Sequence, residues 1–319
     1  MAAKRNVPFT IATCFISRPG NFKADSRVAV MMRNLMNLLA LVLIIGGLAY
    51  HFAALKIFNA LVPKDAGTTR VAESVAYGPD PRQRLDVYAP AGARGPLPIL
   101  FFVNGGSWND GARGDYEFAG RAFAAGGYLT LAMDYRLMPE NPFPSFVQDI
   151  AIAMAWAQNH GAEFGGDPRR MFAVGHSAGA YNIALAVLDK HYLEAAGVDP
   201  KALRGVATLA GPFDFLPLDT RVTIDTFGKV ADPAATQPIN FANADAPPFL
   251  LLTGAGDKTV FPRNSRALAR RLTEAGAAAT VKEYRGVGHA GIMLALARPL
   301  RKEATPVYED ILEFFAQQK

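Results

Sequence analysis

Residues 169–188, RRMFAV-GHSAG-AYNIALAVL, decide the fold. The apolar run at 171–174 predicts a buried strand, and residues 178–189 have the composition of a helix. Between them lies Gly175-His176-Ser177-Ala178-Gly179, a G-x-S-x-G pattern in the strand–turn–helix context that a nucleophile elbow requires. The helix N-terminus below it favours developing negative charge. We expect Ser177 to present its hydroxyl above a sheet, against the alternative of a chance pentapeptide with a surface serine.

On both sides of this stretch, short apolar runs rich in β-branched and aromatic residues alternate with helical patterns. This alternation predicts an α/β fold with a mostly parallel central sheet flanked by helices. The strand-like runs are Leu85–Tyr88, Pro98–Val103, Tyr128–Met133, Met171–Val174, Gly205–Leu209, Phe249–Leu252 and Thr280–Tyr284. The helix-like stretches include Tyr116–Ala125, Pro144–Asn159, Ala178–Asp189, Arg263–Ala275 and Pro306–Gln317. The proline-rich, irregular stretch Gly211–Pro248 is typical of a lid or a substrate-binding loop.

A serine hydroxyl is a poor nucleophile at neutral pH and needs a base and an acid that orients it. His191 and His289 follow Ser177 in the chain. His191 lies among charged residues, as surface histidines do, whereas His289 lies in the glycine-flanked segment GVGHAG, so we expect His289 to be the base. Asp257 follows the apolar run at 248–252 and is the expected acid, with a turn or helix cap as its alternative role. Asp214, in GPFDF, is the second candidate acid.

Acyl transfer also needs hydrogen-bond donors for the oxyanion. The strand-like run at 98–103 is followed by Asn104-Gly105-Gly106-Ser107-Trp108. Glycines in such a turn leave backbone N–H groups free to point inward. Together with the N–H of Ala178 they are expected to form the oxyanion hole.

These motifs, in this order, resemble the α/β-hydrolase superfamily, and within it the esterase and lipase group similar to hormone-sensitive lipase and to bacterial feruloyl-esterase-like enzymes. The resemblance covers about residues 72–315. It rests on NGGSW (104–108), DYRLMPE (134–140), GGDP (165–168), GHSAG (175–179), GAGDKTV (254–260) and GVGH (286–289).

The resemblance implies an α/β-hydrolase fold and a set of site residues. The triad would be Ser177, Asp257 and His289; the oxyanion donors would be the backbone N–H groups of Gly106, Ser107 and Ala178; and the substrate-pocket candidates are Asn104, Gly105, Trp108 and His176. The family pattern usually begins the oxyanion turn with His, where this chain has Asn104. An asparagine side chain also holds a loop by hydrogen bonds, so we expect the hole to survive, although substrate preference does not transfer.

The N-terminus differs from the rest of the chain. Residues 1–33 form a basic leader with six Lys or Arg against the single Asp25, so this leader alone accounts for the formal net charge of +5. Residues 34–55 carry no charged side chain and reach roughly 33 Å as a helix, enough to cross a bilayer core of about 30 Å. Residues 34–62 are therefore predicted to be a signal anchor or a cleaved signal peptide. Met31 is an alternative start.

Residues 63–319 are predicted to form the catalytic domain. The basic leader places that domain across a membrane, in the periplasm or outside the cell, either anchored or secreted after cleavage. Because the body is formally neutral, nucleic-acid binding is not expected. The single cysteine, Cys14, excludes a disulfide framework and a multi-cysteine zinc site, and with no P-loop or dinucleotide-binding glycine pattern we expect no metal and no cofactor.

The predicted function is hydrolysis of small-molecule carboxylic esters through an acyl-enzyme. An amide or peptide hydrolase, formamidase-like or prolyl-peptidase-like, is the alternative within the same chemistry. A non-catalytic binding protein on the same fold is the alternative from another class.

Overall fold

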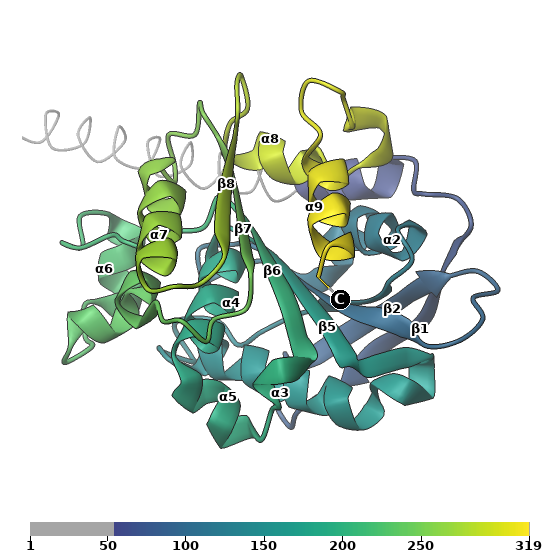
Figure 1. Ribbon diagram of the computed structural model, residues 1–319, viewed down its shortest axis with the longest axis horizontal. Helices are drawn as coiled ribbons and strands as arrows, with labels where there is room; N and C mark the ends of the chain where they lie inside the picture. The colour runs from purple at the N-terminus through teal and green to yellow at the C-terminus, as the bar shows by residue number, and fades with distance from the viewer. Residues whose placement is uncertain (1–53, 319) are drawn as a thin grey trace, which may run out of the picture. The chain divides into compact units, whose positions relative to one another are not determined.

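A computed structural model describes residues 54–318 of the chain. Within them eight strands form one sheet in the order β1-β2-β4-β3-β5-β6-β7-β8 (Figure 1). The strands are β1 (Thr68–Ala76), β2 (Arg84–Pro90), β3 (Leu97–Val103), β4 (Leu129–Met133), β5 (Gly166–His176), β6 (Leu203–Leu209), β7 (Phe249–Gly254) and β8 (Ala279–Tyr284). β4, β3, β5, β6, β7 and β8 pair in parallel, and β1 and β2 are antiparallel to their neighbours. The prediction of a mostly parallel α/β sheet is confirmed.

The central strands are apolar along their length because both faces of the sheet are covered. The last five residues of β3, ILFFV, are all buried, as are all five residues of β4. Side chains of successive residues point to opposite faces, and the buried residues accordingly divide into two large apolar clusters.

Helices cover each face of the sheet (Figure 1). One cluster takes residues from α3 (Ser145–His160), α4 (Ala178–Leu188), α5 (Lys190–Ala196), α6 (Arg221–Phe227) and α7 (Arg263–Glu274). The other takes residues from α2 (Glu117–Ala125), α8 (His289–Leu294) and α9 (Val307–Ala316).

Strand β1 was not predicted from the sequence. Its residues, TTRVAESVA, are exposed or half-buried along the whole strand, and it pairs with β2 alone. An edge strand of this kind lacks the continuous apolar run that marks the central strands.

The stretch Gly211–Pro248, expected to be irregular, contains α6 and the short 3-10 helices η4 (Pro233–Thr236) and η5 (Pro238–Phe241). Helix α6 begins with a capping box. The Thr220 hydroxyl accepts a hydrogen bond from the backbone N–H of Thr223 at 3.1 Å, and the Thr223 hydroxyl accepts one from the backbone N–H of Thr220 at 3.3 Å. The start of α6 is therefore stabilised by local hydrogen bonds, and the helix needs no long apolar pattern in the sequence.

The folded unit begins before the predicted boundary at residue 63. Compact contacts place Leu55–Lys319 in one unit, and residues 54–61 are helical. Leu55 and Phe58 pack on the apolar cluster of α2, and the Asn59 side chain accepts a hydrogen bond from the Phe118 N–H at 3.1 Å. The sequence alone did not separate this apolar helix from the uncharged run before it. The predicted leader and most of the predicted signal segment lie outside the described residues, and among residues 54–318 no helix is long and apolar enough to span a bilayer.

Candidate active site

Ser177 lies at a sharp turn between β5 and α4. Its backbone has φ 53° and ψ −120°, a conformation that L-residues rarely adopt. The turn is possible because Gly179 packs against the end of β3, where a Cβ atom would lie 2.3 Å from the Val103 carbonyl oxygen. A Cβ on Gly175 would likewise lie 2.7 Å from the backbone N of Ala180. This is the nucleophile-elbow geometry that the sequence predicts.

The structure brings the three predicted reactive side chains together. His289 Nε2 lies 2.9 Å from Ser177 Oγ, and His289 Nδ1 lies 2.8 Å from Asp257 Oδ2. All three follow the carboxyl ends of parallel strands: β5 for Ser177, β7 for Asp257 and β8 for His289. Parallel strands place these ends at one edge of the sheet, so residues far apart in the chain meet there.

Asp257 is held as an anion. Its residue is 3% exposed, and its Oδ1 accepts hydrogen bonds from the backbone N–H groups of Thr259 at 2.8 Å and Val260 at 2.9 Å. Burial alone raises the pKa of this carboxyl, but the hydrogen bond and charge of His289, together with these backbone donors, outweigh it and lower the pKa below its ordinary value. The carboxylate therefore stays available to orient the imidazole.

His289 is the first residue of α8, with Gly288 as the N-cap. The sequence shows His289 in a glycine-flanked segment, ahead of the helix-like stretch ALARPL at 295–300; in the structure the helix begins at His289 itself and ends at Leu294, and a short 3-10 helix follows at Arg298–Leu300. The six-residue helix is too short to show a clear apolar period.

The expected oxyanion turn follows β3. Gly106 has φ 135°, and a Cβ there would lie 2.0 Å from the Asp110 carbonyl oxygen. Ser107 also has positive φ, at 53°, and its side chain is exposed. Ala178 is the first residue of α4, where backbone N–H groups have no partner within the helix. Gly106 and Ser107 thus lie on the turn after β3, and Ala178 lies at the helix start directly after Ser177; their role as oxyanion donors stays a prediction.

Asn104, which replaces the histidine of the resembling family, is 1% exposed. Its side-chain Nδ2 donates to the Gly105 backbone carbonyl at 2.8 Å, and the backbone carbonyl of Asn104 accepts from the Tyr135 hydroxyl at 3.1 Å. Asn104 therefore ties the turn to the loop after β4, although it lies beneath the turn and does not line the surface. Gly105 packs directly on Ser177, since a Cβ there would lie 3.0 Å from the serine Cβ.

Trp108, another substrate-pocket candidate, is a packing residue that is 3% exposed. Its Nε1 donates to Asn182 Oδ1 at 2.9 Å, and its ring meets Tyr181 and Phe227 edge-to-face with centroids 5.1 and 4.9 Å apart. The carbonyl of Trp108 accepts from the N–H of Met138 at 2.8 Å. This tryptophan consequently connects the oxyanion turn to α6 and to the loop after β4.

The DYR segment after β4 is structural. Arg136 pairs with the fully buried Asp149 on α3, with Nη2 2.8 Å from Oδ1, and Gln83 Nε2 donates to the same carboxylate at 2.7 Å. Asp134 pairs with Arg113. These contacts fix the loop that carries Met138, and the sequence did not predict their pairing because each partner comes from a different element.

The two alternative residues have hydrogen-bond partners outside the predicted triad. His191 is exposed and its Nδ1 lies 2.6 Å from Asp189 on the same helix end. Asp214 is exposed, and its backbone N–H donates to Asn264 Oδ1 at 2.9 Å. Within residues 54–318, no group of three His, Cys, Asp or Glu side chains could hold a metal ion.

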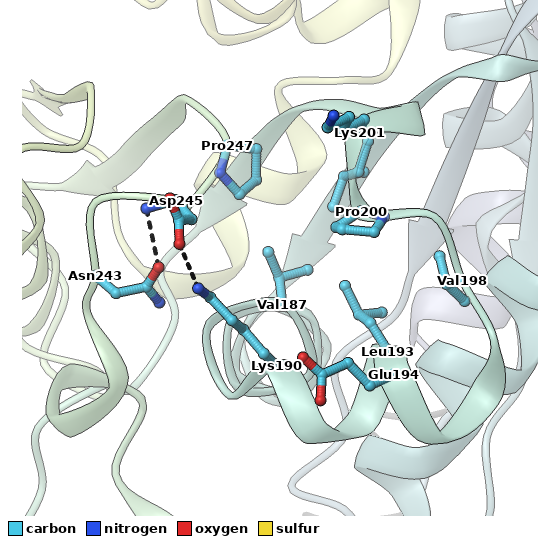
Figure 2. A pocket seen from close by; sticks show the side chains of 11 residues that line it. Val187, Lys190, Leu193, Glu194, Val198, Pro200, Lys201, Asn243, Asp245 and Pro247 are labelled. Carbon is cyan, nitrogen blue, oxygen red and sulfur yellow. Dashed lines mark hydrogen bonds and ion pairs between the residues drawn. The ribbon is translucent and has the colours of Figure 1, made fainter.

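Two of the cavities differ in where they lie relative to Ser177 and the expected oxyanion turn. One, of about 500 Å³, lies between α5, the start of β6 at Leu203 and the loop 243–247 (Figure 2). The backbone N–H of Ser177 instead donates a hydrogen bond to the carbonyl of Leu209, at the other end of β6. A strand of this length spans about 20 Å. The cavity in Figure 2 is therefore remote from Ser177.

The second cavity, of about 1000 Å³, lies between the loop after β4 and α6. Its walls include Asn109, Met138, Phe143 and Val222. Asn109 follows the oxyanion turn directly, at two residues from Ser107, so their Cα atoms are at most about 7 Å apart. This cavity therefore adjoins the expected oxyanion turn.

Comparison with known proteins finds relatives among esterases. Residues 85–272 match the BD-FAE family. A probable isoprenylcysteine alpha-carbonyl methylesterase of Oryza sativa subsp. japonica is 28% identical over 93% of the chain and 78% of that protein. Esterase LipC of Mycobacterium tuberculosis is 32% identical over 70% of the chain and 60% of that protein. The chain spans 55–63% of the length of six of the curated relatives that it matches.

Solved structures share the fold. Esterase B of Lactobacillus rhamnosis superposes with a TM-score of 0.75 at 22% identity, over 87% of this chain and 94% of that one. A thermostable esterase of Pseudomonas putida superposes with a TM-score of 0.69 at 25% identity, over 84% of this chain and 89% of that one. The family match spans more than half of the sequence, and the chain belongs to the BD-FAE family, within the esterase group of the α/β-hydrolases.

Proposed function

We propose that the protein hydrolyses carboxylic esters through an acyl-enzyme formed on Ser177. The observation that carries this proposal is the continuous hydrogen-bonded path from Ser177 Oγ to His289 at 2.9 Å and from His289 to Asp257 at 2.8 Å. An unreactive binding protein has no need of a serine in a rare backbone conformation beside a paired imidazole and carboxylate. Membership of an esterase group favours an ester over an amide as substrate.

The reaction begins at the serine. The Asp257 carboxylate accepts the Nδ1–H of His289, which leaves the Nε2 lone pair facing the serine hydroxyl. As Ser177 Oγ bonds to the ester carbonyl carbon, its proton passes to Nε2. The imidazolium then returns that proton to the alkoxide oxygen as the C–O bond breaks, and the alcohol leaves. Water repeats the sequence on the acyl-enzyme and releases the carboxylic acid.

The carbonyl oxygen gains negative charge each time the serine or the water adds to the carbonyl carbon, and loses it when the leaving group departs. The backbone N–H groups of Gly106, Ser107 and Ala178 are the proposed donors to that oxygen. Preorganised donors of this kind act without reorganising during the reaction, which gives the strained turn at residues 106–108 a purpose: Gly106, Ser107 and Trp108 all have positive φ.

The cavity between Phe143 and Val222 is the proposed place for the larger part of the ester. Its volume of about 1000 Å³ exceeds what an acetyl or methyl group needs. The two walls of the cavity, the loop after β4 and helix α6, both contact Trp108: the Met138 N–H donates to the Trp108 carbonyl, and Phe227 of α6 packs on the Trp108 ring. Trp108 therefore sets the position of the cavity relative to the turn at residues 104–108.

We also propose that residues 34–55 tether or export this domain. Support comes from the uncharged run and the basic leader before it. On this proposal the ester is met outside the cytoplasm.

The test of the activity is hydrolysis of a panel of p-nitrophenyl esters of increasing acyl length by the full chain, with Ser177→Ala as the control. We expect turnover by the wild type and loss of nearly all of it in the variant. Turnover that survives unchanged in Ser177→Ala would contradict the proposal.

A further inference from the structure

His176, the residue before the serine, lies between the two halves of the active site. It ends β5 and is 6% exposed. One side of its ring meets Gly105 of the oxyanion turn, where a Cβ would lie 3.0 Å from His176 Nδ1. The other side faces the His289 ring, with centroids 4.9 Å apart. A residue placed in this way bears on both the base and the oxyanion turn.

A hydrogen bond determines which nitrogen of His176 carries the proton. Nε2 lies 3.0 Å from the backbone carbonyl oxygen of His289. A carbonyl oxygen only accepts, so Nε2 must carry the hydrogen. Nδ1 is buried and has no hydrogen-bond partner among the described residues. His176 is thus a donor to the chain segment that bears the base, and its second nitrogen is a bare lone pair.

The surroundings keep this side chain neutral. A second proton on Nδ1 would point at Gly105, which offers no acceptor there, and would put a cation beside the imidazolium that His289 becomes during the reaction. Burial and then His289 lower the pKa of His176 to about 3, against the smaller opposing effects of the bond to the His289 carbonyl and of Asp257. His289, on α8, and Asp257, in the loop after β7, are the titratable residues that act on the pKa of His176.

We propose that His176 is a positioning residue for the base: its neutral Nε2–H tautomer holds the backbone of His289, and so keeps the imidazole aligned between Ser177 and Asp257. The inference rests on the proposed esterase activity. His289 begins a helix of six residues whose N-cap, Gly288, has no side-chain hydrogen bond to the helix. The bond from β5 therefore supplies a fixed point at the start of α8 that local capping does not supply.

Two amide variants separate this role from simple filling of space. In His176→Gln the side-chain amide reaches about as far as Nε2 and donates to the same carbonyl. In His176→Asn the same amide is buried but is one methylene too short. We expect Gln to retain most of the wild-type kcat and Asn to lose about 10²-fold with little change in KM, since displacement of a catalytic group by about 1 Å costs this much. Hydrolysis of p-nitrophenyl acetate is the assay, with rates expressed per active site titrated by a phosphonate.

The pH profile adds a readout that packing would not change. We expect the acid limb of kcat/KM to involve the same number of protons in the wild type and in His176→Gln, because His176 stays neutral over that range. Equal kcat in the Gln and Asn variants, whether high or low, would overturn the proposal, and so would a two-proton limb in the wild type that becomes a one-proton limb in Gln. If instead Ser177→Ala kept full turnover, the esterase activity itself would fail.

Discussion

Replacement of Gly106 by alanine tests whether the oxyanion is held by the backbone of the turn. A Cβ atom at this position would lie 2.0 Å from the Asp110 carbonyl oxygen and 2.6 Å from its carbon. Those atoms are backbone, and the Asp110 N–H is itself bonded to the Gly106 carbonyl at 3.0 Å, so the neighbour cannot give way without the turn moving. The φ of 135° adds strain for any L-residue.

The size of the effect follows from the steric clash and the backbone strain. The backbone strain of an L-residue at this φ amounts to roughly 1–3 kcal/mol, which is less than the free energy of unfolding of an ordinary domain. The fold therefore survives while the turn shifts and the N–H donors leave their positions. Loss of one oxyanion donor lowers turnover by about 10²–10³-fold, and we expect Gly106→Ala to fall in that range, with Gly106→Val at least as low.

Ser107→Ala is the matched control, because the Ser107 side chain is exposed and only its N–H is expected to donate. This variant should keep most of its activity. Asn104→Ala should fall between the two, since it removes the bond that holds the Gly105 carbonyl. The assay is kcat at saturating ester, with folding checked by circular dichroism. An inactive Ser107→Ala together with an active Gly106→Val would show that the side chain is the donor and would refute this reasoning.

Three other changes have distinct outcomes. Asp257→Asn should lower kcat by about 10⁴-fold through the wrong imidazole tautomer, and a loss below tenfold would argue against its role. Because the pKa of Asp257 is lowered in the fold, its contribution to stability is present above the ordinary carboxyl pKa near 4 and is lost as the pH falls further; urea midpoints between pH 3 and pH 7 should therefore drop more in the wild type than in Asp257→Asn. Asp65→Ala should lower the free energy of unfolding by about 3 kcal/mol while kcat stays unchanged, because it leaves Arg301 of the bidentate pair at 2.8 Å without its partner; an unchanged urea midpoint would contradict this. A reporter fused after Lys319 should be active outside the cytoplasm, and activity confined to the cytoplasm would refute the proposed topology.

The central part of this fold is predictable because its physics is local to the sequence. Buried parallel strands such as ILFFV need apolar residues on both faces, and long helices such as α3 need an apolar stripe. The G-x-S-x-G pattern likewise carries its own geometry, since Gly179 has no room for a side chain. Asp257 and His289 each follow a predicted strand of the parallel sheet, so their meeting with Ser177 at the carboxyl edge of that sheet could also be predicted.

The features that escaped prediction depend on contacts between distant segments. Strand β1 is polar and gains its place by pairing with β2. The hydrogen bond from His176 to the backbone carbonyl of His289, at the start of α8, joins residues 113 positions apart. No local sequence pattern predicts a hydrogen bond of this kind. For that reason His176 was expected only as a substrate-pocket candidate, whereas its ring is buried between Gly105 and His289.

The acyl-enzyme tests the central claim most directly. The full chain is mixed with a slowly turning-over ester, quenched in acid within the first turnovers, and its mass is measured intact and after proteolysis. The account predicts a mass increase equal to one acyl group, located on the peptide that contains Ser177, and no increase in Ser177→Ala. An acyl group on a different residue, formed at the rate of turnover, would contradict it.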